Sequence, residues 1–180
     1  MKRISINLSF VIVSLVLALS VNTSRAADTE TDGYKTYELS QFFVSIPTEF
    51  VKQEGWSSET NMRLNSEAYN LHDDGEEYSS SATIDVYYVE GNILDINEYA
   101  ANWQVGVRIA DGACDEPIIE GNIVLLHSYY EVGEGMMNNW RFTLINDDGR
   151  IAGGMVSYHS DDAKYYENIL MPIIQSIQFK

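Results

Sequence analysis

The sequence is poor in cysteine, in basic residues and in long apolar runs, and each shortage excludes a class of protein. Cys114 is the one cysteine, so no internal disulfide can form and the fold must depend on its hydrophobic core. Lysine and arginine number 11 against 27 aspartates and glutamates, which excludes nucleic acid as a natural partner because the surface repels phosphate. Beyond the N-terminus, no stretch approaches the roughly 20 apolar residues that a membrane-spanning helix needs.

The N-terminus has the layout of a secretory signal peptide. Met1-Lys2-Arg3 is positively charged, Ile4 to Val21 is almost wholly apolar, and Ser24 and Ala26 place small side chains where a signal peptidase requires them. No cysteine lies near the predicted cleavage after Ala26, so a lipid anchor on a new N-terminal cysteine is excluded. We therefore expect a periplasmic or secreted protein without a transmembrane anchor in the mature chain.

The rest of the chain has the size of one ordinary domain. Removing residues 1–26 leaves 154 residues, with eight basic residues against 27 acidic ones and a net charge of −19. Residues 27–33 are acidic and lack large apolar side chains, which predicts a flexible lead-in. Residues 34–180 are predicted to form a single α+β domain. The high net charge keeps such domains apart, and we expect a monomer or a weak oligomer.

Alternating apolar residues predict an antiparallel β-sheet. In the segment 80–90, the apolar side chains Ala82, Ile84 and Val86 share one face and the polar side chains Thr83 and Asp85 share the other. Two turns with glycine, Glu120-Gly121-Asn122 and Asn146-Asp147-Asp148-Gly149, predict hairpins between neighbouring strands. The predicted pairs of strands are Asn61–Leu71 with Ser80–Glu90, Ile118–Ile119 with Ile123–Val132, and Asn139–Ile145 with Ile151–His159.

Two amphipathic segments predict helices over this sheet. In Asp95 to Asp111, apolar residues recur at helical spacing, Asp95 suits the N-cap and Gly112 suits the C-terminal cap. A second helix is predicted to begin at Ser160-Asp161-Asp162. Its apolar positions include Pro172, which removes one backbone hydrogen bond, and we expect a kink or a break near Leu170.

Two segments resemble one known fold group. Phe43-Val44-Ser45-Ile46-Pro47-Thr48-Glu49-Phe50 is an aromatic strand that ends in Ile-Pro, and Ile169 to Phe179 is a helix that leads into Ser-Ile-Gln-Phe. Together with the order of the elements, they resemble the PsbP-like and Mog-like group, which includes exported bacterial relatives of the DcrB type. The resemblance implies an antiparallel sheet sandwiched by helices (an α/β/α sandwich) and a non-catalytic binding or assembly role. The basic surface that some relatives use is absent from this chain.

Catalytic motifs are missing, but one enzymatic alternative stays open. The sequence contains neither Gly-x-Ser-x-Gly nor Ser-x-x-Lys. His127 and His159 both fall on predicted strands, so they could meet across the sheet, with Asp85 or Ser128 nearby. Such a site would suit a small hydrolase or isomerase. Satisfied or exposed histidines are the commoner outcome in folded proteins.

A third alternative is a calcium-binding domain. The acidic hairpin tip gathers four carboxylates and an imidazole, and hard cations bind carboxylate oxygens. Its spacing does not match the EF-hand calcium loop, and a solvated hairpin tip is the simpler interpretation. The candidate ligands are His72, Asp73, Asp74, Glu76 and Glu77.

Cys114 offers little chemistry in its sequence context. The carboxylates of Asp111, Asp115 and Glu116 lie close in sequence and should raise the pKa of the thiol. An intermolecular disulfide is the alternative for a lone cysteine in an exported protein. Taken together, the sequence predicts an exported, non-enzymatic binding or assembly module without a cofactor, whose partner is a protein or a small ligand outside the cytoplasm.

Overall fold

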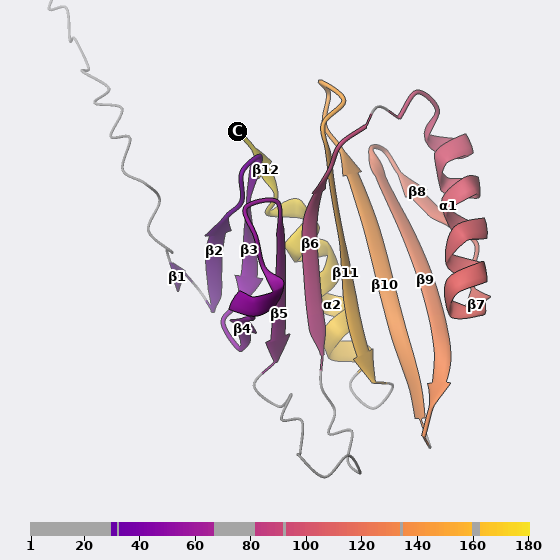
Figure 1. The fold of residues 1–180 in the computed structure, drawn as a ribbon, viewed down its shortest axis with the longest axis horizontal. Coiled ribbons are helices and arrows are strands. Elements are labelled where there is room, and N and C mark those ends of the chain that lie inside the picture. The colour runs from indigo at the N-terminus through magenta and orange to yellow at the C-terminus, as the bar shows by residue number, and fades with distance from the viewer. Residues whose placement is uncertain (1–29, 32, 67–81, 92, 134, 160–162) are drawn as a thin grey trace, which may run out of the picture.

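The chain folds into two antiparallel sheets and two α-helices (Figure 1). A computed structural model describes residues 30–31, 33–66, 82–91, 93–133, 135–159 and 163–180. The smaller sheet has the strand order β1-β2-β3-β12, and the larger has the order β4-β5-β6-β11-β10-β9-β7, with β8 also paired to β9. The strands of the smaller sheet are β1 (Glu30–Thr31), β2 (Tyr34–Glu38), β3 (Phe42–Pro47) and β12 (Gln178–Phe179). Those of the larger sheet are β4 (Phe50–Lys52), β5 (Asn61–Ser66), β6 (Thr83–Val89), β7 (Ala113–Cys114), β8 (Ile118–Glu120), β9 (Ile123–Val132), β10 (Gly135–Ile145) and β11 (Ile151–His159).

The helices lie against different parts of the larger sheet. The helical elements are η1 (Glu54–Trp56), α1 (Ile96–Asp111) and α2 (Ala163–Gln175). In Figure 1, α2 lies behind the larger sheet, and α1 runs along its right-hand edge beside β9 and β7. This arrangement confirms the predicted α+β class with an antiparallel sheet flanked by helices.

The face of the larger sheet that α2 covers holds the hydrophobic core. Phe142, Val156 and Ile84 come from three adjacent strands and have no exposed surface. The buried stripe of α2 and the inner residues of β3 complete the same cluster. Burial of a large apolar side chain contributes about 1.5–3 kcal/mol, so most of the stabilisation comes from this face. The contributing residues of α2 and β3 are Tyr166, Ile169, Leu170, Ile173, Ile174, Phe42, Val44 and Ile46.

On the other face of the larger sheet, α1 packs mainly against β9. Ala100 and Val107 are the buried residues of α1, and Val124 and Leu126 of β9 are fully buried. The remaining strands meet helices only toward the margins of this face: Tyr99 Oη of α1 lies 2.9 Å from Thr143 Oγ1 of β10, and η1 contacts β5. Between these contacts, no helix of the described chain lies over β10, β11, β6 and β5 on this side (Figure 1). We call this part of the sheet the open face.

Local signals in the sequence placed most of the elements correctly. β5 pairs with β6, β8 with β9, and β10 with β11, as predicted. Gly149 in the last of these hairpins has φ +85°, a conformation that favours glycine. The side chain of Asp95 caps α1 by accepting hydrogen bonds from the backbone N–H groups of Asn97 and Glu98. β1 pairs with β2 from within the segment that the sequence analysis treats as a lead-in.

The sequence predicts a kink or a break near Leu170, and no break occurs there. α2 runs continuously from Ala163 to Gln175, and Pro172 lies in its last turn. The proline removes one backbone hydrogen bond there, but Ile173 and Ile174 are buried in the core and hold the turn in place. The predicted start of this helix at residues 160–162 lies outside the described residues.

Candidate functional site

Polar side chains cross the open face in rows that follow the strand register. One row runs across four strands in the order Arg141, Met155, Asp85 and Arg63, each directly opposite the next. The neighbouring row runs Thr143, Gly153, Tyr87 and Asn61. Because residues directly opposite each other share a face, these side chains all project toward the open side of the sheet.

The first row ends in an ion pair between Arg63 and Asp85. Arg63 Nε donates to Asp85 Oδ1 at 2.7 Å, and Nη2 donates to Oδ2 at 2.8 Å. The guanidinium also lies over the ring of Trp56, with 5.3 Å between Arg63 Cζ and the ring centroid. Trp56 is 68% exposed, which places an aromatic ring at the rim of the open face.

Between these rows lies a hollow of about 330 Å³. Tyr87 forms part of its lining, and its ring packs against the backbone of Gly153, where an added Cβ would lie 2.5 Å from Tyr87 Cε2. Burial raises the pKa of Tyr87 above its usual 10, and the nearby Tyr99 adds to the shift, so the phenol is protonated at neutral pH. The side chains that the hollow presents include Asn61, Arg63, Asp85, Tyr87, Arg141 and Met155.

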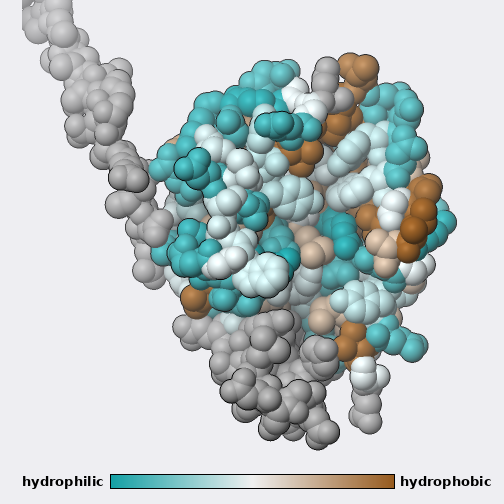
Figure 2. All heavy atoms as spheres, viewed as in Figure 1, coloured by the Kyte–Doolittle hydropathy of each residue, from teal (hydrophilic) through white to brown (hydrophobic). Residues whose placement is uncertain are grey.

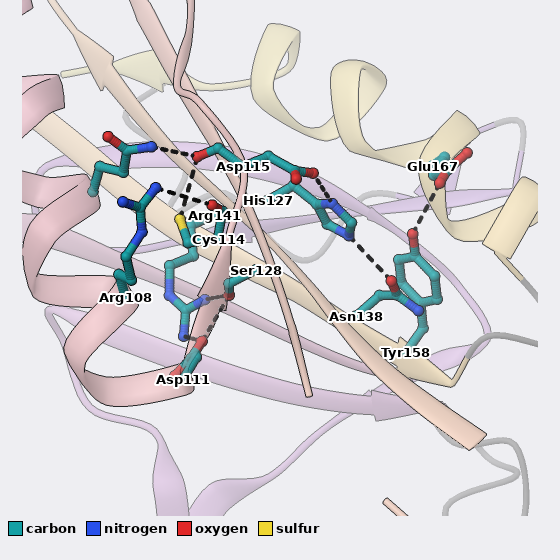
Figure 3. A network of polar contacts seen from close by, with 11 residues as sticks. Arg108, Asp111, Cys114, Asp115, His127, Ser128, Asn138, Arg141, Tyr158 and Glu167 are labelled. Atoms are coloured by element: carbon teal, nitrogen blue, oxygen red, sulfur yellow. Dashed lines mark hydrogen bonds and ion pairs between the residues drawn. The ribbon is translucent and has the colours of Figure 1, made fainter. Parts of the chain in front are cut away.

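A buried polar network fixes the α1 end of the first row (Figure 3). Arg141 Nη2 lies 2.8 Å from Asp111 Oδ2 at the end of α1, and Arg141 Nη1 donates to Ser128 Oγ. Ser128 has no exposed surface, and its hydroxyl donates to Asp111 Oδ2 at 2.6 Å. Asn139 joins the network by donating from Nδ2 to Asp111 Oδ2 at 3.4 Å, and its Oδ1 accepts a hydrogen bond from Ser157 Oγ at 2.7 Å. The network therefore holds the Arg141 guanidinium in a fixed position at the hollow.

A second polar cluster surrounds His127. Its ring stacks on Trp140 with 4.6 Å between the centroids. His127 Nδ1 lies 2.7 Å from Asp115 Oδ2, and Nε2 lies 3.1 Å from Asn138 Oδ1. Because Trp140 packs against the hydrophobic core, this cluster lies on the face that α2 covers. Its hydrogen bonds connect β9 and β10 to the segment after β7, which is a structural role.

The structure does not bring His127 and His159 together. Trp140 of β10 lies opposite both His127 and Val156, so these three side chains share the α2-covered face. His159 is three positions beyond Val156 on β11 and projects from the open face. The two imidazoles are thus separated by the sheet, and the predicted hydrolase or isomerase site built from both of them does not form.

The structure describes only some of the other candidate site residues predicted from the sequence. The predicted calcium ligands His72, Asp73, Asp74, Glu76 and Glu77 lie outside the described residues. Elsewhere, the described ranges contain no group of three or more His, Cys, Asp or Glu that could hold a metal ion.

Cys114 lies on β7, the short strand at one edge of the larger sheet. Its pKa is raised, chiefly by burial, while Arg108 opposes the shift and Asp115 adds to it. The direction agrees with the sequence analysis, but burial contributes more than the neighbouring carboxylates. The thiol is therefore a weak nucleophile at neutral pH. The intermolecular disulfide stays a prediction.

Comparisons with known proteins agree with this architecture. No family model and no curated protein matches the sequence. The Ran-binding protein Mog1p of Saccharomyces cerevisiae superposes with a TM-score of 0.51 at 10% identity, covering 81% of this chain and 94% of Mog1p. The cyanobacterial PsbP protein CyanoP of Synechocystis superposes with a TM-score of 0.53 at 11% identity, covering 88% of this chain and 99% of CyanoP.

The chain has a Mog1/PsbP-like fold. This result confirms the resemblance that the aromatic Ile-Pro strand and the C-terminal helix indicated. At such low identity the likeness extends to the fold, and no functional residue is transferred from either protein.

Sequence reasoning overlooked the open face. It placed Thr83, Asp85 and Tyr87 together on the polar side of one strand, but it assigned them no role. Within each strand the polar side chains alternate with apolar ones, and this pattern includes Arg63 and Arg141. Only the register of the strands shows that these side chains form one continuous row.

The open face presents several kinds of polar and apolar groups. It offers guanidinium and phenol donors, carboxylate and amide acceptors, and the adaptable thioether of Met155. The hydroxyl of Ser128 is fully buried between Asp111 and Arg141, so it is not accessible to a molecule on the open face. No helix in the described part of the chain is both long and apolar enough to cross a membrane.

Proposed function

We propose that this protein is an exported, non-enzymatic binding module that holds a protein or small-molecule partner on the open face. The hollow of about 330 Å³ beside Arg141 and Tyr87 is the observation that carries the proposal. Figure 2 views this face and shows mainly teal and pale side chains over its middle. The mixture of fixed charges, an aromatic ring and a thioether suits recognition of a partner that presents both polar and apolar groups.

The energetics of the ion pairs support a role in binding. The side chains of Arg141 and Asp111 are 18% and 14% exposed, so both charges have lost most of their hydration. Such pairs contribute little net stability, and apolar residues of similar size would serve the fold as well. The presence of this ion pair beside a hollow is therefore better explained by the charged groups that it offers to a partner.

Two further observations support the class of function and its location. Mog1p, which shares the fold, is described as a Ran-binding protein, so the architecture can serve protein recognition. The N-terminal leader with small residues at Ser24 and Ala26 supports export to the periplasm or beyond. The acidic composition of the chain points to a partner without strong negative charge.

Filling the hollow tests the proposal. Asn61 is exposed at the rim, and Asn61→Trp would occupy the hollow without removing a core contact. Asn168→Trp is the matched control, because Asn168 is exposed on α2, which covers the opposite face. We expect chemical cross-linking in the envelope of the native cell to give an adduct with the wild type and the control that the Asn61→Trp variant loses. An identical adduct from all three proteins would contradict the proposal.

A separate experiment tests whether the protein is exported. Mass spectrometry of the protein recovered from the periplasmic or extracellular fraction should give a mature chain that begins near Ala27. An uncleaved chain confined to the cytoplasm would contradict this part of the proposal and leave the binding role of the open face to be judged by the cross-linking alone.

A further inference from the structure

The outward side of α1 exposes a row of aliphatic side chains. Val105 is 59% exposed and Ile109 is 81% exposed, and the buried residues Ala100 and Val107 lie on the opposite side of the helix. Figure 2 shows brown side chains on α1 at the right of the view. The exposed side chains on this side, which we call the outer strip, are Glu98, Ala101, Asn102, Val105, Arg108 and Ile109. The outer strip is separate from the open face.

The second helix shows that this exposure is not a general property of the chain. The outward positions of α2 include Lys164, Glu167 and Asn168, which are polar and exposed. Its aliphatic residues are mostly buried in the core. An exposed aliphatic strip on an amphipathic helix is typical of a surface that packs against another helix.

The charged residues of the outer strip indicate which helix can pack against it. Glu98 and Arg108 lie five residues on either side of residue 103, and Ala101 and Val105 lie two residues on either side. When two copies of α1 pack antiparallel about a two-fold axis at this level, each Glu98 lies opposite Arg108 of the other copy, and each Ala101 lies opposite Val105. A parallel arrangement would instead place Glu98 against Glu98 and Arg108 against Arg108.

We propose that the outer strip of α1 is a self-association surface for a second copy of this chain, packed antiparallel with two reciprocal Glu98–Arg108 ion pairs. The small side chain of Ala101 allows close approach, and Val105 and Ile109 fill the contact. Leu94, 91% exposed just before the helix, extends the apolar surface toward the end of the partner helix. Because one pair of helices buries little area against a high net charge, the dimer is weak and forms at high concentration.

The competing occupants fit less well. A bilayer surface with anionic headgroups would be repelled by a chain of net charge −16. A partner helix without a matching pair of charges would leave Glu98 and Arg108 facing apolar groups. The reciprocal arrangement of the two charges is what favours a second copy.

Sedimentation velocity over a concentration series tests the proposal, with Cys114→Ser in every protein so that no disulfide contributes. The background protein should shift from monomer to dimer as concentration rises. Ile109→Asp should abolish the shift, because it places a carboxylate in the apolar contact. Tyr165→Asp is the matched control, since Tyr165 is 46% exposed on α2 and should leave the association unchanged.

Charge reversal tests the orientation. Glu98→Arg or Arg108→Glu alone should weaken the association about tenfold, because like charges then face each other. Combining the two reversals should restore it to near the background value. A chain that stays monomeric at every concentration, an Ile109→Asp variant that still dimerises, or a double reversal as weak as the singles would overturn the proposal. Circular-dichroism melting curves confirm that each variant is folded.

Discussion

The two faces of the larger sheet are built from the same strands but differ in composition and in cover. Along β10, Phe142 projects into the core under α2 and is fully buried, while its neighbour Arg141 projects to the open face and joins an ion-pair network. Along β6, Ile84 likewise projects into the core, while Asp85 projects to the open face and pairs with Arg63. The difference shows that one face supplies most of the stability of the fold, which leaves the other able to carry polar groups.

The largest expected effect separates the two faces by stability. Phe142→Ala should lower the free energy of unfolding by about 3–5 kcal/mol, because it removes a fully buried ring from the core. Met155→Ala on the open face should cost about 1 kcal/mol, since that side chain is only partly buried. Urea denaturation measures the free energy of unfolding of both variants. Equal losses would show that the two faces contribute equally to stability.

The ion-pair network of the open face should respond differently to single and double changes. Asp111→Leu alone should cost about 3 kcal/mol, because it leaves the Arg141 guanidinium poorly solvated and without its carboxylate. Adding Arg141→Met should recover most of this loss, since the pair itself contributes little net stability. Denaturant titrations of the two singles and the double variant give the coupling energy. Additive losses would mean that the two charges act independently.

Alanine substitutions at two adjacent glycines of β11 compare how tightly the two faces are packed. A Cβ at Gly154 would lie 2.6 Å from the backbone oxygen of Asp85 and would collide with the ring of Phe142, whereas one at Gly153 would meet the ring of Tyr87. We expect Gly154→Ala to cost about 1–3 kcal/mol and Gly153→Ala to cost less, because the Tyr87 ring can turn toward the hollow. Thermal unfolding ranks the two, and the reverse order would show that the open face is packed as rigidly as the core.

The smallest expected effect is a loss of stability at alkaline pH. Burial raises the pKa of Tyr158 on the α2-covered face and of Tyr87 on the open face above the usual value of 10. The unfolded chain therefore ionises first, so stability is fully present below pH 10 and falls as the pH rises above it. Tyr158→Phe and Tyr87→Phe should each reduce this fall in denaturant titrations at several pH values. A fall unchanged in both variants would assign it to other groups.

The strands and helices were predictable wherever the residues that decide them are close in sequence. Asp95 and Gly112 mark the ends of α1 through local hydrogen bonds and a positive φ, and the turn before Gly149 fixes its hairpin. The continuity of α2 at Pro172 was not predictable in this way. It depends on burial of Ile173 and Ile174 against strands that lie far away in the sequence.

The candidate site was less predictable than the fold. The hollow lies between Arg141, Tyr87 and Arg63, which come from three strands and share no motif. The same limitation produced the hypothesis that His127 and His159 meet, because a strand pattern does not state which face each strand turns toward its neighbours. A shift of one residue in register would move every such side chain to the opposite face.

The sequence by itself predicted a secretory leader, and it determined the acidic composition, the lack of an internal disulfide, the α+β class and most element boundaries, since these depend on composition and on neighbours within a few residues. The tertiary structure decided which polar residues form the rows of the open face, which histidines are separated by the sheet, and which side of α1 stays exposed. Those outcomes depend on strand register and on where the helices pack, and both are set by contacts between residues that are distant in the chain.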